Sequence, residues 1–235
     1  PSHRIIVLSP HPLRVTRSCL RMVIQGHGLF LKKGVVMSRL KDLNTPVFWV
    51  EGHPGRLDRA SWKIEVTGLC DHPRIITWTD LMAMRKSVAD ARLTSVTRFS
   101  VRGLWGGVRI SDLMAATGVR PEARFLRFRS VGLVYDTSVP RDVASAERTL
   151  LAWEFDGEYL EEDYGGPVRV FCPYLWGYKS AKSVVAITVQ DHSTPGYWER
   201  LGYPDEGQIK RRRILDVNSG RLRRIGDGEV VDFLD

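Results

Sequence analysis

Long hydrophobic runs are missing from this sequence of 235 residues. No uninterrupted apolar stretch approaches the roughly 18–20 residues that a membrane-spanning helix needs. Nor does any stretch combine the charged, apolar and small-residue parts of a secretory signal. We therefore expect a soluble protein without a membrane span.

Cysteine is also scarce, with Cys19, Cys70 and Cys172 scattered along the chain. This spacing lacks the close pairs of a zinc site, and three cysteines are too few for a disulfide-rich scaffold. We therefore expect a reducing compartment and a cytoplasmic location.

Acidic residues are absent from the first 36 positions, where six Arg and Lys side chains lie, which leaves +2 of the formal charge of +8 for the rest. This basic extension, residues 1–36, reads as a transit peptide or as sequence translated from upstream of a start at Met37. Only the positive charge favours nucleic-acid binding, and we do not expect this function. The later cluster, Lys210 to Arg213, is more typical of a solvated face or of a contact with an acidic redox partner.

Secondary-structure patterns become regular after Asn44. Alternation in 61–67 places Trp62, Ile64 and Val66 on one face of a strand. Two short helices are predicted, one beginning near Thr79 and one beginning near Ser111 and ending at Gly118. Further strands are expected at 94–101, 125–128, 150–155, 168–172 and 184–189.

Many strands with a few short helices and loops rich in glycine and proline predict an α+β fold with mixed sheets. We expect one domain over residues 37–205, followed by a basic C-terminal tail over 206–235.

Five separated segments occur in an order that resembles the molybdopterin-binding domain of the sulfite oxidase superfamily, in its small single-domain prokaryotic form. They are residues 45–54, 98–108, 135–140, 150–170 and 176–182. The resemblance implies molybdopterin as the cofactor. It also implies that His53, Lys179, Ser180 and Lys182 hold the pterin and its phosphate, since a buried phosphate requires charge-assisted hydrogen bonds.

The resemblance further implies that Tyr135 is a catalytic residue beside the metal. Ser100 takes the place of the cysteine that binds molybdenum in the family, and it is the candidate metal ligand. A serine there is either a harder ligand than a thiolate or simply a buried hydroxyl bonded to backbone. Glu51 replaces a substrate-binding arginine, and like charges at about 4 Å cost roughly 1 kcal/mol in water, which argues against sulfite as the substrate.

Two functions remain open from the sequence. One is a molybdopterin-dependent oxidoreductase that transfers an oxygen atom to or from a small substrate and exchanges electrons with a separate carrier. The other is a non-catalytic or cofactor-binding member of the family that has lost the metal ligand.

Overall fold

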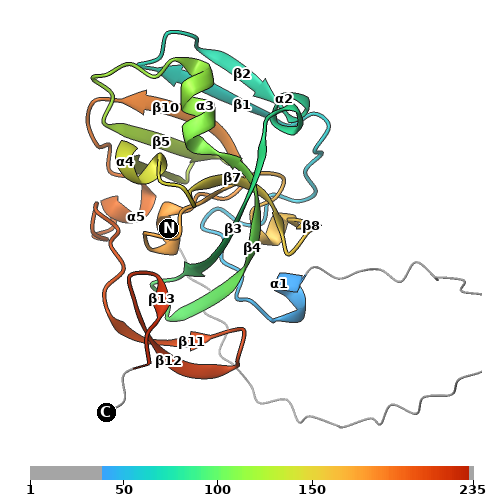
Figure 1. Cartoon of the computed structure of the whole chain (residues 1–235), viewed down its shortest axis with the longest axis vertical. Coiled ribbons are helices and arrows are strands. Elements are labelled where there is room, and N and C mark those ends of the chain that lie inside the picture. The colour runs from blue at the N-terminus through green and yellow to red at the C-terminus, as the bar shows by residue number, and fades with distance from the viewer. Residues whose placement is uncertain (1–38, 233–235) are drawn as a thin grey trace, which may run out of the picture. The chain divides into compact units, whose positions relative to one another are not determined.

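The computed structural model describes residues 39–232, which form two packed sheets with short helices at their edges (Figure 1). The extension at 1–36 lies outside the described residues, so the domain boundary predicted at residue 37 stays a prediction. Within the described range, no helix is long and apolar enough to cross a bilayer. Cys70 and Cys172 are buried and carry free thiols.

The first sheet has five strands in the order β2-β1-β10-β5-β6. They are β1 (Lys63–Gly68), β2 (Arg74–Thr77), β5 (Phe125–Ser130), β6 (Asp136–Pro140) and β10 (Val184–Gln190). The pair of β1 and β10 is parallel, and the other pairs are antiparallel. Trp62, Ile64 and Val66 are buried, which confirms the predicted face.

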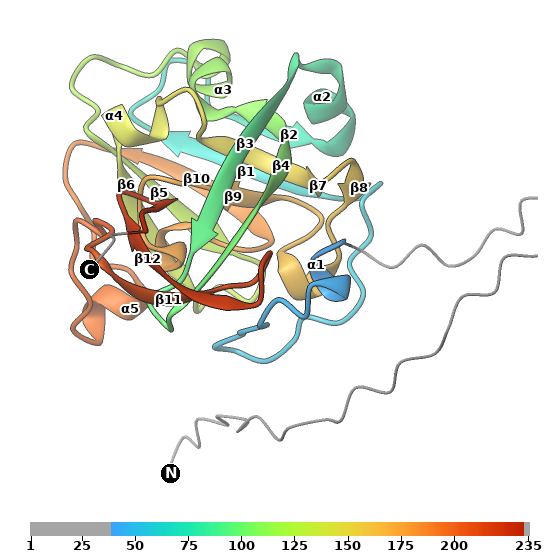
Figure 2. The same ribbon diagram turned by 60° about the horizontal axis from the view of Figure 1, so that its bottom comes forward.

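The second sheet has eight strands. Six of them follow the order β13-β12-β11-β4-β7-β8, while β3 pairs with β4 and β9 pairs with β7. Its strands are β3 (Lys86–Thr94), β4 (Phe99–Arg109), β7 (Leu150–Phe155), β8 (Glu158–Tyr159), β9 (Arg169–Phe171), β11 (Arg212–Asp216), β12 (Arg221–Gly226) and β13 (Glu229–Val230). Figure 1 shows the long β3–β4 hairpin running from the region of α2 down to β11 and β12, and Figure 2 shows the same hairpin from below.

Helices are short and lie at connections between strands. They are α1 (Arg39–Asp42), α2 (Trp78–Ala83), α3 (Ile110–Thr117), α4 (Arg141–Ala144), α5 (Tyr197–Arg200) and the 3₁₀ turns η1 (Glu162–Tyr164) and η2 (Gly177–Lys179). The predicted end of α3 is confirmed, because Gly118 adopts the left-handed conformation with φ 62°. The helix predicted to begin near Thr79 is confirmed as α2, which begins one residue earlier at Trp78 and has Thr77 as its N-cap in a capping box with Asp80.

The α+β fold with mixed sheets is confirmed, and most predicted strands lie within a residue or two of observed ones. The strand expected over 94–101 is wrong, because the chain reverses there between β3 and β4. Ser95 N donates to the carbonyl of Phe99 at 2.8 Å, and Arg98 has a φ of 70°. The Ser95 hydroxyl also accepts from the backbone N–H of Thr97 at 3.2 Å, a bond that favours a turn over a continuous strand.

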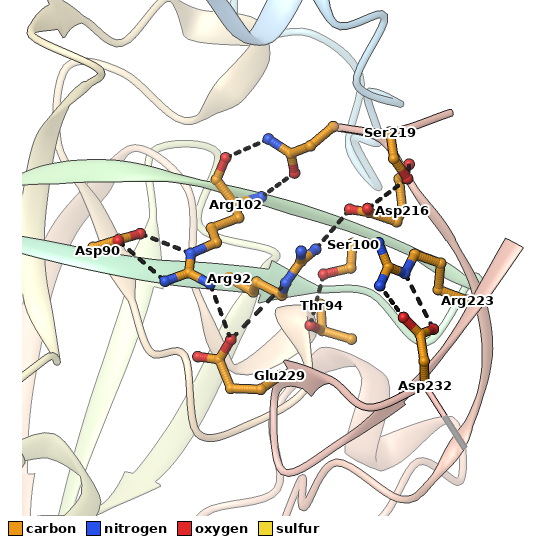
Figure 3. Close-up of polar contacts among 11 residues, drawn as sticks. Asp90, Arg92, Thr94, Ser100, Arg102, Asp216, Ser219, Arg223, Glu229 and Asp232 are labelled. Atoms are coloured by element: carbon orange, nitrogen blue, oxygen red, sulfur yellow. Dashed lines mark hydrogen bonds and ion pairs between the residues drawn. The ribbon is translucent and has the colours of Figure 1, made fainter. Parts of the chain in front are cut away.

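The tail expected over 206–235 is corrected as well, since β11, β12 and β13 lie within it and extend the second sheet. A buried ion pair accounts for this. Arg92 on β3 donates to Asp216 on β11 at 2.7 Å, with side chains only 8% and 3% exposed (Figure 3). Burial opposes ionisation of Asp216, but hydrogen bonds from Ser219 and Arg92 lower its pKa below the usual range. The ion pair between Arg92 on β3 and Asp216 on β11 therefore helps to hold the C-terminal strands on the sheet.

Removing one partner of this buried pair should destabilise the fold strongly. Asp216→Ala leaves Arg92 buried without its carboxylate, and we expect the free energy of unfolding at pH 7 to fall by about 3 kcal/mol in urea titrations. Asp90→Ala is the matched control. It breaks the ion pair with Arg102, whose side chain is 47% exposed, and it should cost less than about 1 kcal/mol. Equal losses in the two variants would contradict the role given to the buried pair.

Candidate active site

The segment 176–182, which contains η2, is the centre of the predicted site, and two of its predicted residues point into the protein. Lys179 Nζ donates to the Ser138 carbonyl at 3.0 Å and to Glu199 Oε1 at 2.5 Å, and both charged side chains are 1% exposed. The Ser180 hydroxyl accepts from the backbone N–H of Cys172 at 3.0 Å. In this structure Lys179 and Ser180 therefore fix the turn, and their predicted contact with a cofactor remains a prediction.

Lys182 and His53, the other two predicted cofactor residues, are brought together. Lys182 Nζ donates to the carbonyls of Phe48 at 2.9 Å and Asp163 at 2.6 Å, and it lies 4.7 Å from the centre of the Trp49 ring. His53 Nε2 lies 3.1 Å from Asp163 Oδ1, and the His53 ring meets the Trp49 ring edge-on. Two segments more than 100 residues apart in sequence thus form one cluster.

Arg169 on β9 stands beside this cluster, and the sequence analysis did not single it out. Its side chain is buried, with the residue 4% exposed, and its guanidinium donates to the carbonyls of Tyr164 at 2.7 Å, Ser180 at 3.1 Å and Val170 at 3.3 Å. No carboxylate within residues 39–232 forms a salt bridge with it. The signal was present in the sequence, because an arginine inside the apolar run 168–172 must be buried with its charge.

Desolvation disfavours protonation of both cations, Lys182 and Arg169. Burial lowers the pKa of Lys182 to about 7, and the nearby Arg169 charge contributes to the same shift, while Asp163 opposes it. Burial also lowers the pKa of Arg169 to about 10. Carbonyl dipoles offset only part of the desolvation of two positive charges. This arrangement favours binding of an anion between or beside them.

Tyr135 lies next to the same turn. It donates a short hydrogen bond to the carbonyl of Tyr178 in η2, and burial raises its pKa well above the usual range. Glu51 positions the segment before it, since its carboxylate accepts from the backbone N–H of Val134 at 3.2 Å and packs against Gly132. Glu51 thus has a structural partner, and Tyr135 is a neutral hydroxyl at the site.

Ser100, the candidate metal ligand, is fully buried on β4. Its hydroxyl lies 3.1 Å from that of Thr94, in the same region as the Arg92–Asp216 pair (Figure 3). This resembles the buried-hydroxyl alternative, although the partner is a side chain rather than backbone. Metal binding by Ser100 is not tested by this contact and stays a prediction.

Ser95, which the sequence interpretation missed, is better exposed at the end of the β3–β4 hairpin. A Cβ added at Gly177 in η2 would lie 3.7 Å from the Ser95 Cα, so the hairpin end contacts the turn directly. At the start of β4, the Phe99 ring stacks on the Phe48 ring, and the Phe48 carbonyl accepts from Lys182. Ser95 was overlooked because residues 94–101 were taken for one strand.

Comparison with known proteins agrees with this geometry. Residues 51–198 match the family described as the oxidoreductase molybdopterin binding domain. The chain belongs to this family. Molybdopterin is therefore its cofactor, and the predicted resemblance to the sulfite oxidase superfamily is confirmed.

Similar curated proteins are oxidoreductases or subunits of them. An uncharacterized oxidoreductase, YuiH of Bacillus subtilis, is 33% identical over 69% of this chain and 82% of its own length. A putative protein-methionine-sulfoxide reductase subunit, YedZ1 of Azospira oryzae, is 31% identical over 63% of this chain and 56% of its own. The catalytic subunit MsrP of a protein-methionine-sulfoxide reductase from Ralstonia nicotianae is 28% identical over 66% and 51%. The chain thus spans about half the length of these reductase subunits.

A solved structure shares the fold. The sulfane dehydrogenase SoxCD of Paracoccus pantotrophus aligns over 72% of this chain and 46% of its own, with a TM-score of 0.58 and 20% sequence identity. At this identity the likeness concerns the fold alone.

The residues of this chain fit a phosphorylated pterin. Arg169 and Lys182 supply positive charge, and Trp49 Nε1 is a buried donor that has no acceptor within the described part of the chain. No group of three or more His, Cys, Asp or Glu side chains in residues 39–232 is arranged to hold a metal by itself. An anion with hydrogen-bond acceptors would thus satisfy this cluster.

The two lysines should differ sharply in their effect on stability. Lys179→Met leaves Glu199 buried without its cation, and we expect unfolding of the cofactor-free protein to become easier by about 3 kcal/mol. Lys182→Met removes a desolvated charge that has no such partner, and it should not destabilise the cofactor-free protein. Denaturant titrations with the two variants and the parent measure the difference.

The effect of Lys182 should depend on pH in a defined direction. Its pKa of about 7 in the folded protein lies below the ordinary lysine value of 10.5, so its protonation costs stability increasingly as the pH falls from above 10.5 to below 7. Lys182→Met should therefore gain stability relative to the parent between pH 9 and pH 6. A constant difference over this range would show that Lys182 is not desolvated.

Proposed function

We propose that this protein is a molybdopterin-dependent oxidoreductase that transfers an oxygen atom to or from a small substrate. Arg169, which is buried, and Lys182, which is half-buried but strongly desolvated, have too little carboxylate charge around them, and they carry the cofactor part of the proposal. The oxygen-transfer part is supported by the names of the relatives, several of which are described as methionine-sulfoxide reductase subunits.

The cofactor, when bound, supplies the two-electron redox chemistry, and the residues of this chain bind and orient it. Lys182 and Arg169 would compensate the phosphate charge, and His53 and Trp49 would donate hydrogen bonds to the pterin. Asp163 connects these residues. Its backbone carbonyl accepts a hydrogen bond from the Lys182 ammonium, and its carboxylate lies beside the His53 ring. Electrons would pass to or from a separate carrier.

Tyr135 would act as a neutral hydrogen-bond donor near the substrate. Its raised pKa means that it keeps its proton at physiological pH, so it would orient an oxygen atom rather than act as a base. This role needs the Tyr135 hydroxyl to turn from the Tyr178 carbonyl toward a ligand.

Molybdenum and pterin content tests the cofactor proposal directly. Purified protein should carry close to one molybdenum per chain together with a pterin. Lys182→Met and Arg169→Met should lose most of both, because an anionic group would then be buried with too little positive charge. Lys63→Met, an exposed lysine on β1, is the matched control and should retain both. Absence of molybdenum and pterin from the parent protein would instead support the non-catalytic alternative.

Two serine substitutions test which hydroxyl faces the metal. The position of Ser95 against η2 favours it over Ser100, which is enclosed beside Thr94. Because a thiolate is a softer ligand than a hydroxyl, Ser95→Cys should change the optical absorption of the molybdenum centre, while Ser100→Cys should leave it unchanged. The reverse result would restore Ser100 as the ligand.

Activity with reduced dye and methionine sulfoxide would then show whether the substrate class in the relatives' names applies here.

A further inference from the structure

A cavity of about 610 Å³ opens beside η2, on the side formed by residues 204–212. Lys210, Arg211 and Arg212 line it together with one carboxylate, Glu206, and Trp176 and Pro204 give it an apolar wall. This volume falls within the range of about 300–1,000 Å³ that is usual for small-molecule sites. Five of these six residues lie beyond residue 198, where the match to the family ends.

Positive charge dominates the cavity. Arg212 is held by the carbonyl of Val96 at 3.2 Å and by the face of the Trp176 ring, with 5.3 Å from its guanidinium carbon to the ring centre. Neither contact neutralises its charge. Lys210 is exposed and takes part in no hydrogen bond or ion pair with another residue of the 39–232 range. Lys210 and Arg212 alone outnumber the one carboxylate of the lining, Glu206, so the cavity attracts an anion.

The wall of the cavity is fixed to the turn beneath it. The backbone N–H of Trp176 donates to the carbonyl of Gly207 at 2.7 Å, and Leu175 forms a β-bridge with Gln208. The Tyr178 hydroxyl donates to the Pro204 carbonyl at 2.6 Å. A ligand would therefore meet a largely preformed wall, which reduces the entropy lost on binding.

The cavity also adjoins the end of the β3–β4 hairpin. Arg212 binds the carbonyl of Val96, the residue that follows Ser95. The Tyr178 hydroxyl donates to the Pro204 carbonyl. The Tyr178 carbonyl in turn accepts from the Tyr135 hydroxyl. The cavity is thus linked to Ser95 through Arg212 and Val96, and to Tyr135 through Pro204 and Tyr178.

We propose that this cavity binds an organic oxyanion, a small molecule with an apolar body and a carboxylate, sulfonate or phosphate group. Lys210 and Arg212 bind the charged group, and Trp176 and Pro204 contact the apolar body. Arginine and lysine are the usual partners of such groups, and the apolar part of the cavity wall accepts the rest of the molecule. This binding does not depend on the identity of the redox reaction.

Calorimetric titration of the full-length protein, as purified, with benzenesulfonate tests the proposal. Benzyl alcohol serves as a neutral probe of similar size, and inorganic sulfate as an anion without the apolar body. We expect saturable binding of benzenesulfonate, and clearly weaker binding of the other two. Lys210→Met should weaken benzenesulfonate binding about fivefold, and Glu206→Gln should strengthen it about twofold, as expected for charges at a partly solvated site.

Arg213→Met provides the matched control. Arg213 is an exposed neighbour on β11 that is not part of the lining, and its loss changes the net charge by the same amount as Lys210→Met. Binding by the Arg213→Met protein should stay within about twofold of the parent. Because Lys210 and Arg213 are both exposed, both variants should melt at the temperature of the parent.

Four results would overturn the proposal. They are no saturable binding of benzenesulfonate, equal affinity in the parent and Lys210→Met, equal weakening by Lys210→Met and Arg213→Met, and binding of benzyl alcohol or sulfate as tight as that of benzenesulfonate. The third result would show attraction to net charge instead of a site, and the fourth would show that charge or apolar contact alone suffices.

Discussion

The desolvation of Arg169 and Lys182 is the constraint on which the candidate site depends. A buried cation is tolerated when carbonyls or carboxylates surround it, and here backbone carbonyls from three different segments are turned toward the two side chains. Those hydrogen bonds hold the segments 48–53, 163–169 and 180–182 together around the two side chains. The site is thus organised by its positive charges before any ligand is bound.

Lys179, in the same segment, is a buried lysine whose charge is compensated by a carboxylate. Lys179 has a carboxylate partner, Glu199, whose Oε1 also accepts from the Thr137 hydroxyl at 2.7 Å. That ion pair joins η2 to α5 and to β6 and leaves no charge for a ligand. Lys179 and Lys182 are three residues apart in the same motif, and the carboxylate partner of Lys179 distinguishes it from Lys182, whose predicted role is to bind the cofactor.

The sequence predicted the fold class and the order of most strands because alternation and glycine positions are local signals. Trp62, Ile64 and Val66 mark β1, and Gly118 ends α3, without reference to distant residues. The end of the β3–β4 hairpin was not predictable in this way. Its hydroxyl-bearing residues are compatible with a strand, and the turn is selected by pairing between β3 and β4 over nine residue pairs.

Long-range pairing also explains why the C-terminal strands were missed. Lys210, Arg211 and Arg213 are exposed, as the charge run indicated, whereas Arg212 binds the Val96 carbonyl and Asp216 pairs with Arg92 on β3. Asp216 and Arg212 both lie on β11, so the ion pair that helps to hold β11 on the second sheet also places Arg212, and Lys210 just before it, near the hairpin end. A change that weakens the Arg92–Asp216 pair should therefore loosen the basic wall of the cavity as well as the sheet, so the oxyanion site and the stability of the C-terminal strands are physically coupled.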